Sequence, residues 1–481
     1  MFWRGVWGYL PLNVLQAVVA FGTIFAFTRL LSPEQFGAFA VAFGIANLAQ
    51  TAGMTWIEAA MARFWAAADE RGETARHMAT TYVMFAVVSA VFVLAAAVLM
   101  FAPFEQEMRW ALAAGVAAGG PRSLVILARE RRRAAGEVMG ASGLDAAYTA
   151  GGFAVGLALA AVGVGAASPL LGAGLAALMC AVFVTPGELR IAKGGRFEAD
   201  RAKAYARYGV PVAVSLMLSI ALSTTDRVIL AWLDGPASAG VYQAGYSLAN
   251  RTLDLMFVWL GMAGWPALVS ALERGGHDAL REAAREQARL MALIALPAAA
   301  GLALVAQPLA EVLVGEEFRA GAARVTPWIA LSGLLAGATV HYLHHAFTLG
   351  KRTVLFAVAM SVPVVANALL CLALVPRFGL NGAVWASAAS FVVGAIASRV
   401  MGRNIVPLPI PWIDIAKAVL ACAVMAVAVR ATPAWGGLPE LILKAGVGAL
   451  TYGAAAWLLD ASGVRSQSAR AVGALRARFA S

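Results

Sequence analysis

Unbroken apolar stretches of bilayer length are the feature that most constrains this chain. Residues 83–101 read VMFAVVSAVFVLAAAVLMF, and residues 355–375 read LFAVAMSVPVVANALLCLALV. A helix needs about 20 mostly apolar residues to cross the hydrocarbon core of a bilayer. Of the 481 residues, 61% are hydrophobic and 13% are charged, and a soluble fold of this size could not bury so much apolar surface. We therefore predict an all-α polytopic membrane protein.

The same length criterion predicts about fourteen transmembrane helices, as two sets of six followed by two more. They lie near residues 7–30, 36–61, 78–101, 108–128, 141–163, 168–189, 209–233, 238–268, 290–314, 322–349, 353–376, 380–400, 412–432 and 440–460. We expect the first of them to be a retained span and not a removed signal peptide. The fourth is the least regular, because Gly119, Gly120, Pro121 and Arg122 interrupt it.

This order of spans predicts two pseudo-symmetric six-helix lobes, followed by two additional helices. The expected parts are an N-terminal lobe, a basic cytoplasmic linker, a C-terminal lobe, two further transmembrane helices and a basic cytoplasmic tail. Their boundaries are 1–190, 191–208, 209–403, 404–461 and 462–481. The arginine spacing in the tail favours an amphipathic helix lying on anionic lipid.

Basic residues collect in alternate loops and in the tail. After even-numbered spans these are Arg63, Arg71, Arg76, Arg129, Arg131, Arg132, Arg133, Arg190, Lys193, Arg196, Arg201, Lys203, Arg207, Arg274, Arg281, Arg285, Arg289, Lys351, Arg352, Arg399, Arg403 and Lys417. The positive-inside rule then places both termini and the basic loops in the cytoplasm. Basic loops facing anionic lipid also explain the net charge of +11 without a nucleic-acid partner.

Residue patterns typical of enzymes and metal sites are missing from the sequence. Cys180 and Cys422 are single residues in apolar stretches, as is Cys371, which is typical of small buried hydrophobes. His341, His344 and His345 share one helix face, but no carboxylate or thiolate motif completes a metal site. The three histidines either pack in the helix bundle or form a lumenal polar patch or proton-sensitive cluster. The sequence has no P-loop, GxSxG or HExxH motif, so we predict a protein that is not an enzyme, with no catalytic residue, cofactor or metal.

Two segments six spans apart match each other without a gap. They are SPEQFGAFAVAFGIANLAQ (32–50) and GPASAGVYQAGYSLANRTL (235–253). The matched pairs are Pro33 and Pro236, Gly37 and Gly240, Phe39 and Tyr242, Phe43 and Tyr246, Ala46 and Ala249, and Asn47 and Asn250. Six spans between the copies give them the same orientation, as in parallel transporter repeats. The pattern favours two lobes around a central cavity that opens to each side in turn.

Ionisable residues inside spans are the candidates for the lining of that cavity, because charge is costly in hydrocarbon. Arg251 lies about 20 Å along its span, near the bilayer midplane. Its planar guanidinium suits a phosphate or diphosphate. Asp254 is three residues further on the same helix face, so an Arg251–Asp254 pair that only stabilises the lobe is the alternative.

For each of the other candidates, substrate binding and a purely structural role are both open. Asp226 and Arg227 interrupt the seventh span and either bind substrate or stabilise the lobe. Arg122 is either a cavity residue or a loop residue, and Asn47 and Asn250 bond either sugar hydroxyls or neighbouring helices. Glu58, in the second span, is expected to pair with an arginine such as Arg63.

Three segments resemble the Wzx-like oligosaccharide flippases, polysaccharide transporters of the MOP superfamily. They are TRLLSPEQFGAFAVA (28–42), DRVILAWLDGPASAGVYQAGYSLANR (226–251) and PRFGLNGAVWASAAS (376–390). The resemblance implies twelve to fourteen spans, two MATE-like six-helix lobes and alternating access. The implied location is the bacterial cytoplasmic (inner) membrane. The implied substrate is an oligosaccharide on undecaprenyl diphosphate, carried from the inner to the outer leaflet for surface polysaccharide biosynthesis. The resemblance also implies cationic residues in the cavity, a role that Arg251 matches best, and an Asp-Arg pair in the seventh span, matched by Asp226 and Arg227.

The alternatives are a MATE-type cation or drug exporter, a lipid II flippase and, last, a membrane saccharide polymerase or ligase. The first span has no charge in its apolar core before Arg29. Lipid II flippases carry charges there and drug-exporting relatives tend to keep a carboxylate there, which disfavours both. Short outer loops disfavour the polymerase. The expected partners are the lipid-linked oligosaccharide and membrane lipids, with contact to polysaccharide polymerase machinery considered and a monomer favoured.

Overall fold

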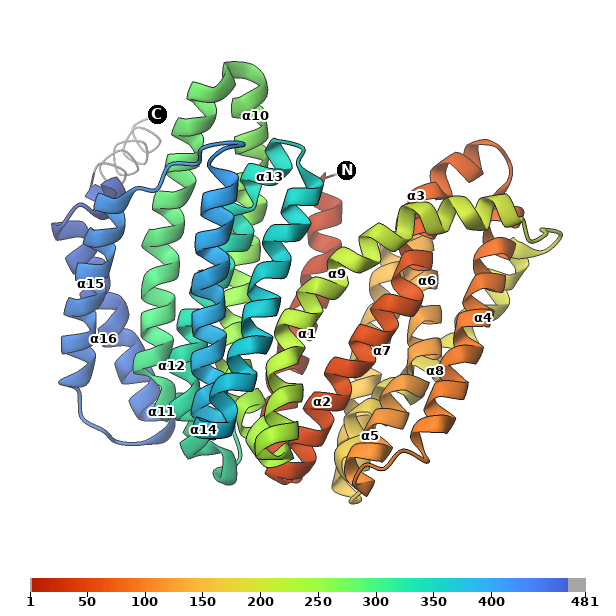
Figure 1. Cartoon of the computed structure of the whole chain (residues 1–481), viewed down its shortest axis with the longest axis horizontal. Coiled ribbons are helices and arrows are strands. Elements are labelled where there is room, and N and C mark those ends of the chain that lie inside the picture. Colours follow the sequence, from red (N-terminus) through yellow and green to blue (C-terminus); the bar gives the residue numbers. More distant parts are fainter. Residues whose placement is uncertain (1, 466–481) are drawn as a thin grey trace, which may run out of the picture. The chain divides into compact units, whose positions relative to one another are not determined.

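The computed structural model of the chain describes residues 2–465, and its side chains from residue 11 onward; the predicted tail helix therefore lies outside the described residues except at its start. All regular structure in 2–465 is helical (Figure 1). The packing divides the chain into two compact units, Met1–Gln243 and Ala244–Ser481. The all-α class is confirmed.

The first unit contains nine α-helices, two short non-α turns and the start of a tenth helix. These are α1 (Phe2–Leu30), α2 (Pro33–Gln50), the π-helix η1 (Thr51–Thr55), α3 (Trp56–Glu70), α4 (Thr74–Leu99), α5 (Gln106–Ala117), α6 (Gly119–Ala134), α7 (Val138–Ala161), the 3-10 turn η2 (Gly165–Ala167), α8 (Ser168–Ala192), α9 (Ala199–Asp234) and the first turns of α10 (Pro236–Leu304). Buried residues are most frequent in α2–α3 and α5–α6, the inner helices of this unit.

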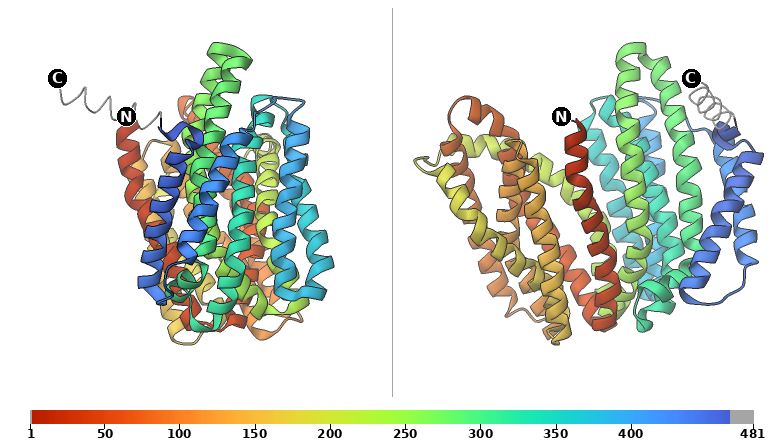
Figure 2. Two further views of the ribbon diagram at one scale, coloured as in Figure 1. Left: turned by 90° about the vertical axis from the view of Figure 1, so that its left-hand side faces the viewer. Right: turned by 180° about the vertical axis from the view of Figure 1, so that it is seen from behind.

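The second unit continues α10 and adds six helices. They are α11 (Ala306–Leu313), α12 (Glu316–Ala338) with its π-helical extension η3 (Thr339–Leu343), α13 (His345–Leu349), α14 (Thr353–Gly402), α15 (Trp412–Arg430) and α16 (Gly437–Leu458), followed by the 3-10 turn η4 (Ala461–Gly463). In both views of Figure 2, α15 and α16 run side by side. Arg289 of α10 donates to Asp414 of α15 (2.8 Å), and Tyr452 of α16 donates to the Leu293 carbonyl (2.7 Å), so both helices are attached to α10.

Eleven helical segments of the described residues are long and apolar enough to cross a membrane. Two of them, α10 and α14, each contain a kink, at Gly276 (φ 66°) and Gly379 (φ 52°). Glycine adopts such positive φ values without the steric cost of a side chain, so each long helix is two helices in sequence. The predicted span 322–349, formed by α12, η3 and α13, is not among the eleven, and the exact count of fourteen stays a prediction.

Local sequence signals explain how the matched segments begin. Ser32 caps α2: its hydroxyl accepts from the Gln35 amide, the Gln35 side chain accepts from the Ser32 amide, and Pro33 takes the first helical position. This is a capping box with proline at the first turn. At the other copy, Gly235 (φ 93°) makes the turn and Pro236 begins α10.

The predicted linker 191–208 is helical in its second half, where α9 begins at Ala199 and continues into the predicted seventh span without a break. Tyr205 of α9 is hydrogen-bonded to His77 of α4, whose other ring nitrogen lies 3.1 Å from the Met61 carbonyl of α3. Arg201 donates to Glu73 at 2.9 Å. These contacts group α9 with the first unit, whereas the predicted lobe boundary assigns residues 209–233 to the second; the lobe boundaries stay a prediction.

Candidate substrate-binding residues

Two predicted site residues meet between the inner helices α2 and α6. Arg122 donates to the Asn47 side-chain oxygen at 3.2 Å. One turn along, Gln50 donates to the Ser123 hydroxyl, also at 3.2 Å. Arg122 is therefore a helix residue and not a loop residue, and the structure joins two side chains that are 75 positions apart.

Glu58 lies beyond the π-helix that follows this cluster. The side chain is buried, and one of its carboxyl oxygens has no hydrogen-bond partner among the described residues. The expected pairing with Arg63 is wrong: Arg63 is exposed and lies over the Phe64 ring, 6.0 Å from its centre. Glu58 and Arg63 are five residues apart in α3, which places them about 140° apart around the helix axis, so their side chains face different sides.

Asp226 and Arg227 belong to a buried hydrogen-bond network. Asp226 accepts from Tyr242 (2.5 Å) and from the guanidinium of Arg227 (3.2 Å), and Arg227 also donates to Gln243. Asp226 and Arg227 are 2% and 5% exposed, and Tyr242 is fully buried. In this conformation both residues connect α9 to the first turns of α10, as the stabilising alternative requires. A substrate contact by either residue stays a prediction.

Arg251 lies in the second unit with its neighbours Asn250 and Asp254. Asn250 donates to the Asp254 carboxylate at 2.7 Å, one helical turn along α10. Arg251 is exposed, and the structure gives it no ion pair within residues 2–465. Arg251 and Asp254 therefore form no ion pair here, and a ligand contact by Arg251 stays a prediction.

Arg131, expected in a basic cytoplasmic loop, is buried instead. It donates to Glu188 of α8 at 2.8 Å and to Glu137 at 2.9 Å, and it lies over the Trp65 ring. The hydrogen bond from Arg131 lowers the pKa of Glu137, which lies between two spans. Because a buried guanidinium needs acceptors on more than one side, this residue joins helices of the first unit and is not available to lipid headgroups.

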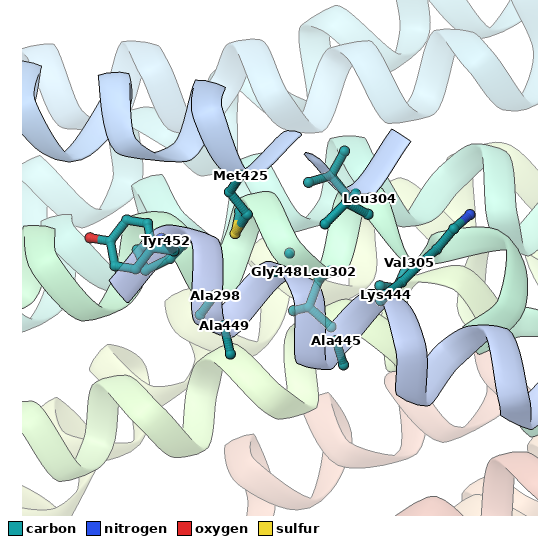
Figure 3. A pocket seen from close by; sticks show the side chains of 13 residues that line it. Ala298, Leu302, Leu304, Val305, Met425, Lys444, Ala445, Gly448, Ala449 and Tyr452 are labelled. Atoms are coloured by element: carbon teal, nitrogen blue, oxygen red, sulfur yellow. The ribbon is translucent and has the colours of Figure 1, made fainter. Parts of the chain in front are cut away.

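A cavity in the second unit was not predicted from the sequence. It has a volume of about 420 Å³ and lies between α10, α15 and α16, with an almost wholly apolar lining that includes Leu302, Val305 and Met425. In Figure 3, Tyr452 and Lys444 lie toward opposite ends of the lining side chains. Lys444 pairs with Glu440 at 2.5 Å. In the sequence, this part of the last span is marked by the two opposite charges Glu440 and Lys444, one helical turn apart.

Within residues 2–465, no group of three or more histidine, cysteine, aspartate or glutamate side chains could hold a metal ion. Among the described residues, the candidate sites consist of hydrogen-bonded side chains, the exposed guanidinium of Arg251 and an apolar cavity.

Comparison with known proteins identifies the relatives of the chain. A family described as polysaccharide biosynthesis protein matches residues 26–323. The chain has no match among curated protein sequences. Among solved structures it is similar to "Lipid II flippase MurJ, inward closed conformation", with a TM-score of 0.74 and 11% identity over 94% of this chain and 98% of that one. It is also similar to an inward-facing multidrug resistance MATE family transporter of the MOP superfamily, with a TM-score of 0.62 and 14% identity over 81% of this chain and 94% of that one.

The family match covers more than half of the chain, and both structural likenesses extend over most of it. At 11% and 14% identity the likenesses establish the fold, and the family match establishes the sequence relationship. The chain belongs to the polysaccharide biosynthesis protein family and has the fold of the MurJ and MATE structures.

Proposed function

We propose that this protein is a flippase that moves an oligosaccharide linked to undecaprenyl diphosphate across the bacterial inner membrane by alternating access. Both termini would lie in the cytoplasm, and the product would serve surface polysaccharide biosynthesis. Three observations support the proposal: the family match, the transporter fold and the exposed, unpaired Arg251. Of these, the exposed Arg251 is the observation on which the proposed binding of the diphosphate headgroup depends.

An unpaired guanidinium on a membrane helix is costly, and an anionic ligand lowers that cost. Arg251 is about 15 residues from the start of α10 at Pro236, which corresponds to roughly 22 Å of helix. A diphosphate accepts two parallel hydrogen bonds from the planar guanidinium. Arg251 would hold the headgroup in this way, and Asn250, bonded to Asp254, would lie on the same helix turn to meet sugar hydroxyls.

The apolar cavity between α10, α15 and α16 supports a lipid-linked substrate. A polyisoprenoid tail needs apolar surface, and the lining supplies it with Leu302, Val305 and Met425. The charge of Lys444 is already balanced by Glu440, so the cavity suits an uncharged chain better than an anionic group. Burial of each methylene contributes about 0.8 kcal/mol.

The test is flipping of a fluorescent undecaprenyl diphosphate oligosaccharide by the purified full chain in proteoliposomes, read as the rate at which label becomes accessible to an impermeant quencher. We expect Arg251→Ala to slow flipping at least about tenfold, because a hydrogen bond to a charged group contributes about 1.5–3 kcal/mol. Arg251→Lys keeps the charge but not the planar pair of donors and should lose less. Arg274→Ala removes another exposed arginine of α10 and serves as the control.

Unchanged flipping by Arg251→Ala would remove Arg251 as the headgroup anchor. If the native protein instead moves lipid II or a cationic dye and not the oligosaccharide lipid, the proposed substrate is wrong and one of the alternatives applies. Export of surface glycan in cells, compared at equal membrane abundance, repeats the test in vivo.

A further inference from the structure

Three histidines of the second unit have no role in the proposed flipping mechanism. His341, His344 and His345 lie where α12 passes through the π-helix η3 into α13. A π-helical turn inside an α-helix is uncommon and frequently marks a functional position. The three imidazoles therefore occupy a segment whose backbone already departs from the regular helix.

The His341 ring fits against α10 only because α10 has glycine there. The ring stacks on Phe257, with 6.0 Å between ring centres and 9° between planes. A Cβ on Gly261 would lie 2.5 Å from His341 Nδ1. Gly264, one turn further on the same face, makes similar room for Gln287, where a Cβ would lie 2.4 Å from the amide nitrogen. Two glycines thus admit two polar side chains to the surface of α10.

Gln287 connects the second half of α10 to the histidines. Its amide nitrogen donates to the His341 carbonyl at 3.2 Å, and the side chain is 8% exposed. Its amide oxygen is buried and has no hydrogen-bond partner among the described residues. The same holds for Nε2 of His345, whose ring lies 4.9 Å from that of Trp265. A buried polar atom without a partner is uncommon in folded proteins, and here two occur in one cluster.

Within residues 2–465, no charged side chain is hydrogen-bonded or ion-paired to the three histidines. The first half of α10 contributes Phe257, Gly261 and Trp265, the second half contributes Gln287, and α14 contributes Phe356 and Ser398, whose hydroxyl lies 3.2 Å from His344 Nε2. The titratable groups close to His344 and His345 are the other histidines. Tyr342, which points away to the Pro409 carbonyl, has Arg285 and Arg399 near it.

An imidazolium in these surroundings would have no carboxylate partner and would repel a second one. Burial of an unpaired charge is costly, so the packed cluster holds neutral imidazoles. A conformation that separated η3–α13 from α10 and admitted water to the rings would let them take up a proton near pH 6.5. A ligand that binds one of two conformations shifts the population toward it.

We propose that His341, His344 and His345, together with Gln287, form a proton-binding site that controls the packing of η3–α13 against α10. In the packed state the site is neutral, and in the separated state it binds a proton. Acidification therefore favours separation. The proposal is independent of the substrate, because every residue in it belongs to the second unit and none is proposed to touch the cargo.

The experiment follows protonation and opening in the same sample, the full chain in nanodiscs. The chain has five histidines, so NMR of histidine-labelled protein can follow each ring, with single His→Gln variants for assignment. Hydrogen exchange of segments 253–290 and 339–349, corrected for the intrinsic effect of pH, measures separation. Between pH 7.5 and 5.5 we expect the exchange rate to rise about tenfold for each proton that the separated state binds. The reason is that pH 5.5 lies about one unit below the pKa of a hydrated imidazole, and each such unit favours the protonated, separated state about tenfold.

The variants separate this site from general acid sensitivity. His341→Gln with His345→Gln should abolish the rise in exchange, whereas His277→Gln, at an exposed position of α10, should leave it unchanged. Should the double variant not fold, Gln287→Glu provides a carboxylate beside the rings and should move the transition about one pH unit or more upward. Histidines that titrate like His277 with no change in exchange, or that stay neutral to pH 5 with no change in exchange, would overturn the proposal.

Discussion

The matched segments 32–50 and 235–253 share a sequence pattern but differ in the charges that they meet. Asn47 accepts a hydrogen bond from the cation Arg122 of another helix. Asn250, its counterpart, donates to the anion Asp254 of its own helix and precedes the exposed Arg251. The repeated pattern therefore places an asparagine side chain at the same position of each helix. The charge of the neighbouring side chain decides whether that asparagine accepts or donates the hydrogen bond.

The two segments also touch each other reciprocally. A Cβ on Gly37 would lie 1.7 Å from the Pro236 carbonyl oxygen, and a Cβ on Gly240 would lie 2.2 Å from the Pro33 carbonyl oxygen. Each glycine thus packs on the proline at the start of the other segment: Gly37 on Pro236, and Gly240 on Pro33. Such a contact leaves no room for any side chain, because backbone atoms cannot move aside as a flexible side chain can.

The largest effect is expected at this crossing. Gly37→Leu and Gly240→Leu should each prevent accumulation of stable protein, and the two losses should be equal if the contact is truly reciprocal. Fluorescence-detected size-exclusion chromatography of solubilised membranes, before and after heating, measures both. Gly453→Ala, where nothing lies within 4 Å of the added Cβ, is the matched control. Loss at one glycine but not at the other would contradict the reciprocal contact.

A smaller effect is expected where the matched aromatic residues differ. Tyr242 donates to buried Asp226, whereas its counterpart Phe39 has no hydroxyl. Tyr242→Phe should destabilise the protein by about 1.5–3 kcal/mol, because it removes a hydrogen bond to a charged group. Thermal unfolding in detergent measures the change, with Tyr208→Phe at an exposed position of α9 as control. Equal stability of the two variants would mean that the Asp226 network does not depend on Tyr242.

The smallest effect, and the sharpest contrast, is expected from one substitution made at both amides. Asn47→Asp keeps the acceptor for Arg122 and adds an opposite charge, so stability should be retained or slightly raised. Asn250→Asp removes the donor to Asp254 and places two carboxylates one turn apart, so stability should fall by about 1 kcal/mol or more. Melting temperatures of the two purified variants provide the comparison. A fall at Asn47 and none at Asn250 would reverse the assigned roles.

The helical architecture followed from the sequence more closely than the site did. The breaks near Gly119, the turn at Pro33 and the kinks at Gly276 and Gly379 all have local residue signals. The pairing of Arg122 with Asn47 has none, because the two residues are 75 positions apart and meet only after α2 packs against α6. The same holds for Arg131, a basic residue near a helix end whose burial by Glu188 and Trp65 depends on α8 and α3.

Apolar stretches of bilayer length determined by themselves that this chain is helical and spans a membrane, since hydrocarbon requires every backbone group to bond within its own segment. Which side chains meet was decided only by the tertiary structure. Tyr242 reaches Asp226, Gln287 reaches the histidines and Gly37 reaches Pro236 because particular helix faces pack together. Hydropathy identifies the segments that can cross the bilayer, and it carries no information on which neighbouring helix a residue will face.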